Sequence, residues 1–159
     1  MPQLVAPAPG LHAVWLECHH EWGPGLHEDG FGLRATDDVR TPAGFASWVH
    51  RRRTDPHCTN WWIVEDGRVL GGAALRHRLD ERTGHVGYGI RPSARRRGVA
   101  SWALRQLLDQ AWEREIGRVL LVCAADNIAS ARTAERAGGV FEGERDGARR
   151  YWFAPPADL

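Results

Sequence analysis

The sequence predicts a single mixed α/β domain, in which a central, mostly antiparallel twisted sheet is flanked by about four helices. A chain of 159 residues suits one domain with one hydrophobic core. Three strand-like segments joined by tight turns precede a long amphipathic helical segment. A short all-apolar run follows that helix, as expected for a strand buried on both faces. No repeat or linker interrupts the chain, so residues 1–159 are expected to form one unit.

Composition favours an ordinary soluble protein of the cytoplasm. The hydrophobic fraction is 43% and the charged fraction is 26%, which are typical values. The formal net charge of +1 argues against a broad nucleic-acid-binding face. No apolar run is long enough to span a bilayer, and the first residues lack the pattern of a signal peptide. We therefore expect neither a nucleic-acid partner nor a membrane partner.

The cysteines and histidines do not predict a disulfide framework or a metal site. Cys18, Cys58 and Cys123 are odd in number and widely spaced, as reduced thiols in a cytosol are. No Cys/His spacing matches a zinc site. His19 and His20 are adjacent and cannot share one helix face, so a site there is disfavoured.

The first half of the chain begins with a short strand and two helices. Gln3–Ala6 is a strand closed by prolines, and Leu11–Trp22 has the apolar spacing of a helix. A second helix opens at Thr41 or Pro42 and runs to about Arg53. The segment between the helices, Gly23–Thr41, is rich in Gly and Asp with little periodicity. It is predicted to be a loop, with a position over a binding groove as one alternative.

Three consecutive antiparallel strands are expected next. Thr59–Glu65 is followed by Asp66-Gly67, a strong hairpin turn, and then by Arg68–Leu79. Gly71-Gly72 inside the second strand suggests a bulge or a close approach of another backbone. The third strand is His85–Arg91.

The second half alternates helix and strand. The helix after the third strand carries apolar residues at helical spacing and ends near Ile116, before Gly117. The remaining predicted elements are a strand at Val119–Val122, a helix from Asp126 or Asn127 to Gly138, and a hairpin of Val140–Glu144 and Arg149–Phe153.

The stretch Gly84–Ala100 is the most informative part of the sequence. An apolar strand turns at Pro92, passes through three arginines and Gly98, and opens into a helix. The first N–H groups of a helix lack intrahelical partners and carry partial positive charge, so this corner suits a phosphate group. A solvated basic turn and a nucleic-acid patch are the alternatives. A nucleotide P-loop does not fit, because no G-x-x-x-x-G-K-[ST] pattern is present.

The segment Arg95-Arg96-Arg97-Gly98-Val99-Ala100 fits the R/Q-x-x-G-x-G/A pattern of the GNAT (Gcn5-related) N-acetyltransferases, which the chain resembles. The likeness continues through 118–127, 128–138 and 139–144, and it is closest to bacterial predicted acetyltransferases. It covers the second half of the chain well and the first half loosely. The resemblance implies the GNAT acyl-CoA N-acyltransferase fold and acetyl-CoA as co-substrate, with no metal.

The resemblance also implies which residues bind the coenzyme. Arg95 and Arg97 would screen the charge of its pyrophosphate on the helix N-terminus. Its pantetheine arm would pair with Tyr88–Arg91, where this strand separates from Leu121–Ala124, in the manner of an added strand. Asn127 would contact the arm, with an ordinary helix cap as the alternative. The expected coenzyme-binding residues are Gly89, Ile90, Arg91, Arg95, Arg96, Arg97, Gly98, Val99, Ala100, Asn127, Ser130 and Arg132.

The implied reaction is direct attack of an amine on the thioester carbonyl, with a backbone N–H near Ile90 holding the oxyanion. His85 and Tyr88 are the nearest candidates for the base, and His77 and Glu65 are alternatives. Many GNAT proteins have an acid, a tyrosine, seven positions after the asparagine. This chain has Ala134 there. Tyr151, or no dedicated acid, would replace it, since a thiol with a pKa of about 8.5 can leave unaided.

Several alternatives remain open at the level of sequence. The leading hypothesis is an N-acetyltransferase acting on a primary amine of a small molecule or a peptide. A non-catalytic acyl-CoA-binding module is the runner-up, and a homodimer is an open question. One hypothesis for the acceptor site is an acidic groove edged by aromatic side chains, which would suit a cationic amine. Its candidate residues are Trp15, Trp22, Trp48, Trp61, Trp62, Glu17, Glu28, Asp29, Asp37 and Asp38.

Overall fold

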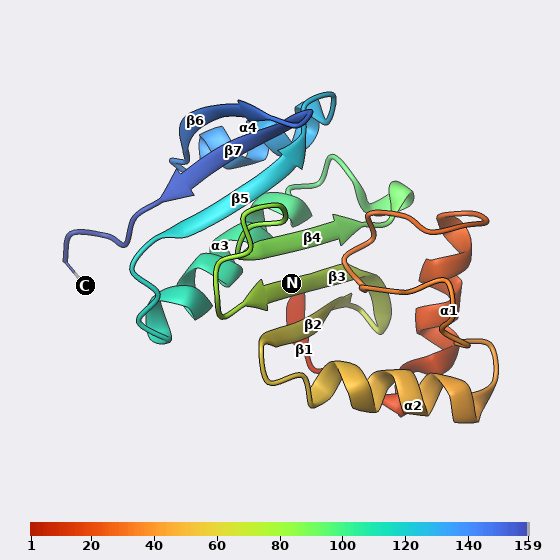
Figure 1. The fold of residues 1–159 in the computed structure, drawn as a ribbon. Helices are drawn as coiled ribbons and strands as arrows, with labels where there is room; N and C mark the ends of the chain where they lie inside the picture. Colours follow the sequence, from red (N-terminus) through yellow and green to blue (C-terminus); the bar gives the residue numbers. More distant parts are fainter. Residues whose placement is uncertain (159) are drawn as a thin grey trace.

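The computed structural model describes residues 1–158 and contains one seven-stranded sheet with the order β1-β2-β3-β4-β5-β7-β6 (Figure 1). Neighbouring strands are antiparallel except β4 and β5, which are parallel. The strands are β1 (Gln3–Val5), β2 (Cys58–Glu65), β3 (Arg68–Arg76), β4 (Val86–Ile90), β5 (Val119–Ala124), β6 (Val140–Arg145) and β7 (Ala148–Phe153). The predicted mixed, mostly antiparallel sheet is confirmed.

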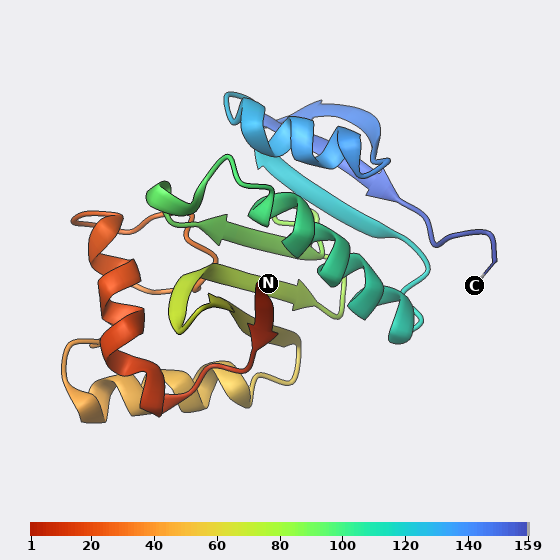
Figure 2. The same ribbon diagram turned by 180° about the vertical axis from the view of Figure 1, so that it is seen from behind.

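The helices of residues 1–158 cover both faces of this sheet. They are α1 (His12–Glu21), α2 (Pro42–Arg53), α3 (Val99–Glu113) and α4 (Ile128–Arg136), with 3-10 turns at Pro9–Leu11 and Pro92–Ala94. Figure 2 shows α3 running across the sheet and α4 lying beside β5 and β7 on the same side. The helices α1 and α2 pack against the strands of the first half of the chain.

Two hydrophobic clusters, one on each face, hold these layers together. Successive strand residues point to opposite faces. Trp62 of β2 accordingly belongs to a cluster with Trp15 of α1 and Trp48 of α2. The next residue, Ile63, belongs to the cluster of α3, which includes Leu104. All five side chains are nearly or fully buried.

The sheet opens between β4 and β5. Within residues 1–158 these strands pair through one residue couple, Val86 with Leu121. Just before it, the N–H of His85 donates to the carbonyl of Leu120 at 2.8 Å. Beyond Val86 the strands diverge, as Figure 1 shows. The backbone edges of both strands therefore face a gap that no strand fills.

Glycines bring the loop of residues 23–41 close to β3 and β4. A Cβ on Gly72 would lie 2.6 Å from the Gly30 backbone, and one on Gly89 would lie 2.4 Å from the carbonyl carbon of Asp29. The register shift expected at Gly71-Gly72 occurs beside them, between β2 and β3. The missing side chains thus make room for this loop.

The order of the elements agrees with the sequence prediction, and their ends differ by a few residues. The strand β3 ends at Arg76, before the predicted Leu79. The helix α3 ends at Glu113, before the predicted Ile116, because Glu115 has a φ of +59° that cannot continue a helix.

Candidate functional site

A cavity of about 530 Å³ lies where β4 and β5 separate. Its walls come from the loop at residues 27–33, the end of α2, the end of β3 with the turn after it, the first residues of β4, the end of β5, the start of α4, and the β6–β7 turn. Segments from both halves of the chain therefore meet at one opening in the sheet. The geometry offers a binding site, entered between the diverging strands.

The turn before α3 has the backbone geometry that an anion-binding site requires. Arg96 has a φ of +63° and Gly98 has a φ of +79°, and no side chain caps the helix. Left-handed residues alternating with ordinary ones turn successive N–H groups toward one point. A Cβ on Gly98 would meet nothing within 4 Å, so the glycine is required by its conformation.

The side chains of Arg95 and Arg97, which were expected to screen a pyrophosphate, contact other parts of the protein instead. The Arg97 side chain pairs with Glu65 at 2.7 Å. Arg95 donates through Nε to the carbonyl of Ile90 at 3.0 Å and lies over the ring of Trp22. Both side chains therefore already have partners, and the backbone offers the more direct contact to an anion. Arg96 is exposed.

The side chain of Arg91, another of the expected coenzyme-binding residues, is buried. It is 3% exposed and pairs with Glu21 at 2.8 Å and with Glu17 at 3.1 Å. It also donates to the carbonyl of Val69. Arg91 thus ties the end of β4 to α1 and does not line the cavity.

The free edge of β4 follows from its register with β3. The N–H of Arg91 donates to Leu70, and the carbonyl of His85 accepts from Arg76. Backbone groups of an antiparallel strand alternate between its two edges. The N–H groups of Tyr88 and Ile90 consequently point toward β5, into the gap, where an extended chain of amides can pair with them.

Three of the predicted residues meet at the start of α4. Asn127 caps this helix by accepting from the N–H of Ser130 at 3.1 Å, as the cap alternative proposed. The Ser130 hydroxyl lies 3.3 Å from the hydroxyl of Tyr88. All three residues line the cavity, whereas Arg132 is exposed on the same helix. Burial raises the pKa of Tyr88, so its hydroxyl keeps its proton near neutral pH.

His85 sits at the seam between β4 and β5, and its geometry disfavours the expected role of base. Its Nδ1 accepts a hydrogen bond from the N–H of Leu120 at 2.9 Å. The neutral ring therefore carries its proton on Nε2 and has no free lone pair for another proton. Burial lowers the pKa of His85, which keeps the ring in this neutral form.

Tyr151 and the alternative bases also lie apart from the cavity. The Tyr151 hydroxyl donates to Glu135 at 2.8 Å, and the residue is fully buried away from the cavity walls. His77 contacts the Thr59 hydroxyl, and Glu65 pairs with Arg97. Of the three catalytic predictions, Tyr88 is the one that the fold brings into the cavity.

The sequence suggested Asp29 as one of several acids for an acceptor groove, and not as a base. Asp29 is 3% exposed and lines the cavity beside β4. One carboxylate oxygen accepts from the N–H of Phe31 at 2.9 Å. Burial raises the pKa of Asp29. Its signal in the sequence, an acid in a glycine-rich loop, is too common to have identified it as a candidate base.

The tryptophans suggested for an acceptor groove lie elsewhere, whereas two of the suggested acids, Glu28 and Asp29, line the cavity between β4 and β5. Trp15, Trp48 and Trp62 are at most 2% exposed and form the cluster under α1 and α2. Trp22 lies under Arg95 and Trp61 under Arg114. No tryptophan of residues 1–158 lines either cavity described in this section.

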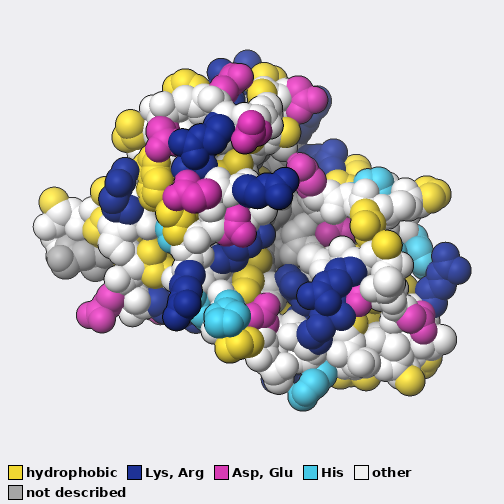
Figure 3. Space-filling model, viewed as in Figure 1, with side chains coloured by type: hydrophobic (Ala, Val, Ile, Leu, Met, Phe, Trp, Pro, Cys, Tyr) yellow, Lys and Arg dark blue, Asp and Glu magenta, His cyan; other side chains and the backbone are white. Residues whose placement is uncertain are grey.

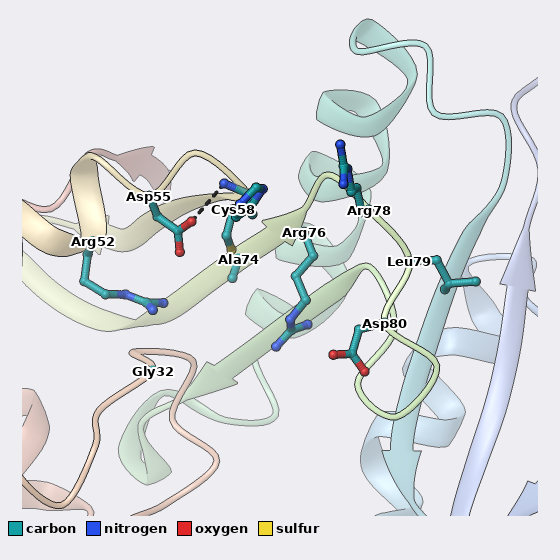
Figure 4. Close-up of a pocket in the computed structure, with 10 residues that line it drawn as sticks. Gly32, Arg52, Asp55, Cys58, Ala74, Arg76, Arg78, Leu79 and Asp80 are labelled. Carbon is teal, nitrogen blue, oxygen red and sulfur yellow. Dashed lines mark hydrogen bonds between the residues drawn. The ribbon is translucent and has the colours of Figure 1, made fainter.

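A second opening of about 500 Å³ adjoins the first one. The two share Gly32, Arg52, Ala74 and Arg76. Figure 4 shows the guanidinium groups of Arg52 and Arg76 extending over β3 and β4. This part of the site is therefore basic and lies on the side of the loop.

Residues 1–158 contain neither a metal-binding cluster nor a membrane-spanning helix. In the part of the chain that the structure describes, no group of three or more His, Cys, Asp or Glu residues is arranged to hold a metal ion. None of the helices in residues 1–158 combines the length and apolar character needed to cross a bilayer.

Relatives and solved structures resemble this chain. A Bacillus subtilis (strain 168) protein named "Putative ribosomal N-acetyltransferase YdaF" is 35% identical over 89 residues, which are 54% of this chain and 48% of that protein. The chain thus spans about half the length of the curated relative that it matches.

Two solved structures cover nearly the whole fold. The microcin C7 self-immunity acetyltransferase MccE, in complex with acetyl-CoA and AMP, has a TM-score of 0.72 and 17% identity, over 97% of this chain and 92% of that chain. The ribosomal L7/L12 α-N-protein acetyltransferase RimL, in complex with coenzyme A, has a TM-score of 0.67 and 19% identity, over 96% and 93%. At such identities the likeness concerns the fold.

The family is shown by a model that spans most of the sequence. The model described as an acetyltransferase (GNAT) domain matches residues 10–140. This range includes the open edge of β4, the turn before α3 and the start of α4. The chain belongs to the GNAT acetyltransferase family.

Proposed function

We propose that this protein is an acetyl-CoA-dependent N-acetyltransferase, which transfers an acetyl group to a primary amine by direct attack on the thioester. The observation that carries the proposal is the unpaired edge of β4, which leads from a cavity lined by the buried Asp29 to the turn before α3. Membership of the GNAT family and solved relatives bound to acetyl-CoA or coenzyme A support it.

Each part of the coenzyme has a matching part of this path. The pyrophosphate lies on the N–H groups of about Arg96–Ala100, beside Gly98. The pantetheine amides pair with the free edge of β4, from Ile90 toward Gly89 and Tyr88. Asn127 keeps its amide N–H groups available, because its cap contact uses the oxygen. Ser130 borders the same space, and Arg132 is exposed on the same helix.

Three groups beside the gap between β4 and β5 then carry out the acetyl transfer. Asp29 accepts a proton from the incoming amine, directly or through water, because its pKa is raised toward the working pH. The Ile90 N–H stabilises the oxyanion. Tyr88, whose hydroxyl is held protonated beside Ser130, donates to the leaving thiolate.

The acceptor is a primary amine of a small molecule or of a peptide. The names of YdaF and RimL refer to ribosomal acceptors, which favours a peptide α-amine among the candidates. A cytoplasmic location would give access to acetyl-CoA and to such acceptors. Assembly into a homodimer stays a prediction.

The test separates coenzyme binding from turnover. Acetyl-CoA at many times its Kd should raise the unfolding temperature, because it binds the folded state alone. An amine panel with detection of free thiol should then reveal transfer. No thermal shift would contradict the proposal at its first step. Tight binding without transfer to any amine would favour a non-catalytic acyl-CoA-binding module.

A further inference from the structure

Two arginines lie at the junction of the two cavities, on the face of the sheet that the loop of residues 23–41 covers. Arg52 comes from the end of α2 and Arg76 from the end of β3. Each lines both cavities. In Figure 3 basic side chains gather around the hollow on this face, and all of them are arginines because the sequence contains no lysine.

The guanidinium of Arg52 is held in place without a carboxylate. It packs against Gly32, where an added Cβ would lie 2.5 Å from the guanidinium carbon, and it donates to the side chain of Asn60. Within residues 1–158, no Asp or Glu lies within 4.0 Å of it. The buried Arg91 and Arg150, in contrast, each pair with two glutamates.

This difference matters because a guanidinium loses hydration on burial and needs an acceptor in return. Burial lowers the pKa of Arg52, which agrees with a loss of hydration that its contacts do not fully offset. The fold therefore keeps a charged, fork-shaped donor in the cavity with part of its hydrogen-bonding capacity unused.

Arg76 is aimed at the same space. It lies over Gly87 of β4, where an added Cβ would be 3.7 Å from its nearest nitrogen. Its guanidinium donates one long hydrogen bond, 3.4 Å to the carbonyl of Thr83. Among residues 1–158 it too has no carboxylate within 4.0 Å, although Asp80 lines the same opening (Figure 4).

The coenzyme phosphates do not account for these two arginines. Gly87 stands near the start of β4, and the turn before α3 follows its end. At about 3.3 Å per residue, Ile90 is already about 10 Å farther along the strand. The anion that the arginines serve consequently enters from the acceptor side.

We propose that Arg52 and Arg76 bind a carboxylate that the acceptor carries a few bonds from its reacting amine. The acceptor is then a free amino acid, or a peptide whose N-terminal residue is acidic. This inference rests on the proposed function and specifies its substrate class. Paired guanidinium groups suit such a group, because each can present two parallel N–H donors to one oxyanion.

The dimensions and charges of the site agree with a carboxylate. Asp29 lies over Gly89 and Arg76 over Gly87, two residues apart on one face of β4, or about 7 Å. This span holds an amine and a carboxylate separated by a few bonds. Asp55 and Asp80 border the arginines and repel a doubly charged phosphate more than a singly charged carboxylate.

The experiment compares acceptors that differ in this one charge. Free amino acids are paired with their carboxamides, and peptides beginning with Asp or Glu are paired with peptides beginning with Asn or Gln. Phosphoserine and phosphoethanolamine form a phosphate arm. We expect at least a tenfold higher kcat/KM for the carboxylate member of one pair. Equal rates within every pair would overturn the inference, and so would a preference for phosphate.

Variants then locate the effect. Arg76→Gln should abolish the preference mainly through a higher KM, with kcat for the uncharged acceptor retained. Arg52→Gln provides an independent second test of the pair. Arg105→Gln, an exposed arginine on α3, is the matched control and should behave as wild type. A preference that survives in both Arg76→Gln and Arg52→Gln would contradict the assignment.

Binding measurements keep this result separate from the proposed function. Calorimetry with the same acceptors, in the presence of coenzyme A, measures carboxylate recognition without turnover. Absence of acetyl-CoA binding would contradict the proposed function alone, because carboxylate binding to the free protein remains measurable. Normal transfer without carboxylate discrimination would contradict the inference alone.

Discussion

Asp29 illustrates how a single side chain acquires its chemistry from packing. Its pKa is raised because the loop of residues 23–41 lies directly on Gly89 and excludes water from the carboxylate. We expect Asp29→Asn to lower kcat/KM by about 100-fold, the scale of a lost general base. The rise of rate with pH through the raised pKa should disappear in this variant, as measured in a pH–rate profile.

The same substitution carries an internal control for folding. A carboxyl whose pKa is raised in the folded state adds stability below its unfolded pKa, and loses that contribution as pH rises through the folded value. Asn is neutral and keeps the oxygen that accepts from Phe31. The variant should therefore be at least as stable as wild type at pH 7 by thermal unfolding. An unchanged pH–rate profile would exclude Asp29 as the base.

Substitution of Tyr88 is expected to slow the reaction less than substitution of Asp29. A coenzyme thiol with a pKa of about 8.5 leaves readily, so a dedicated acid adds little at neutral pH. We expect Tyr88→Phe to lower kcat by roughly tenfold, with the larger loss for acyl transfer below pH 7. Ser130→Ala removes the hydroxyl partner and should have a weaker effect in the same assay. A Tyr88→Phe enzyme with wild-type kcat across pH would show that no acid is needed.

At the scale of elements, the turn before α3 can be tested with a matched pair of glycines. Gly98 and Gly138 both have positive φ, +79° and +90°, and both have open space around the missing Cβ. Replacement by Ala should cost each variant about 1 kcal/mol of unfolding free energy. Only Gly98→Ala should also weaken acetyl-CoA binding, because it disturbs the N–H groups at the start of α3.

The comparison is made by calorimetric titration with acetyl-CoA, alongside denaturant unfolding of each variant. Equal coenzyme affinity of the two variants would contradict the assignment of the phosphate site. Because both substitutions strain the backbone in the same way, a general loss of stability cannot produce the expected difference.

The sequence was most informative about the helices and strands. Apolar periodicity and turn residues predicted every strand and helix of the sheet in order, because both signals are local. The site was only partly predictable. Gly98 and Asn127 could be identified because a turn and a helix cap are also local. The roles of His85, Arg91 and Arg97 depend on Leu120, Glu21 and Glu65, which lie far away in sequence.

On the scale of the whole molecule, Glu21 links α1 to the segment that leads into the coenzyme turn. Its carboxylate pairs with the buried Arg91 and accepts from the N–H and hydroxyl of Ser93, both at 2.7 Å. Burial raises the pKa of Glu21, but the hydrogen bonds from Ser93 and the contact with Arg91 outweigh burial and lower it to about 2. This ion pair thus joins α1, in the first half of the chain, to the end of β4 in the second half.

This pair predicts how stability depends on pH. A carboxyl with a lowered folded pKa contributes its stabilisation above its unfolded pKa of about 4.5, and loses it as pH falls through about 2. Glu21→Gln should cost about 2 kcal/mol of unfolding free energy at pH 7, because Arg91 then loses a charged acceptor. The gap between the variant and wild type should shrink progressively below pH 4.5 in urea unfolding curves. Glu113→Gln, on the exposed face of α3, should show no such trend. A gap that stays constant from pH 7 to pH 3 would mean that the charge of Glu21 does not hold the two halves together.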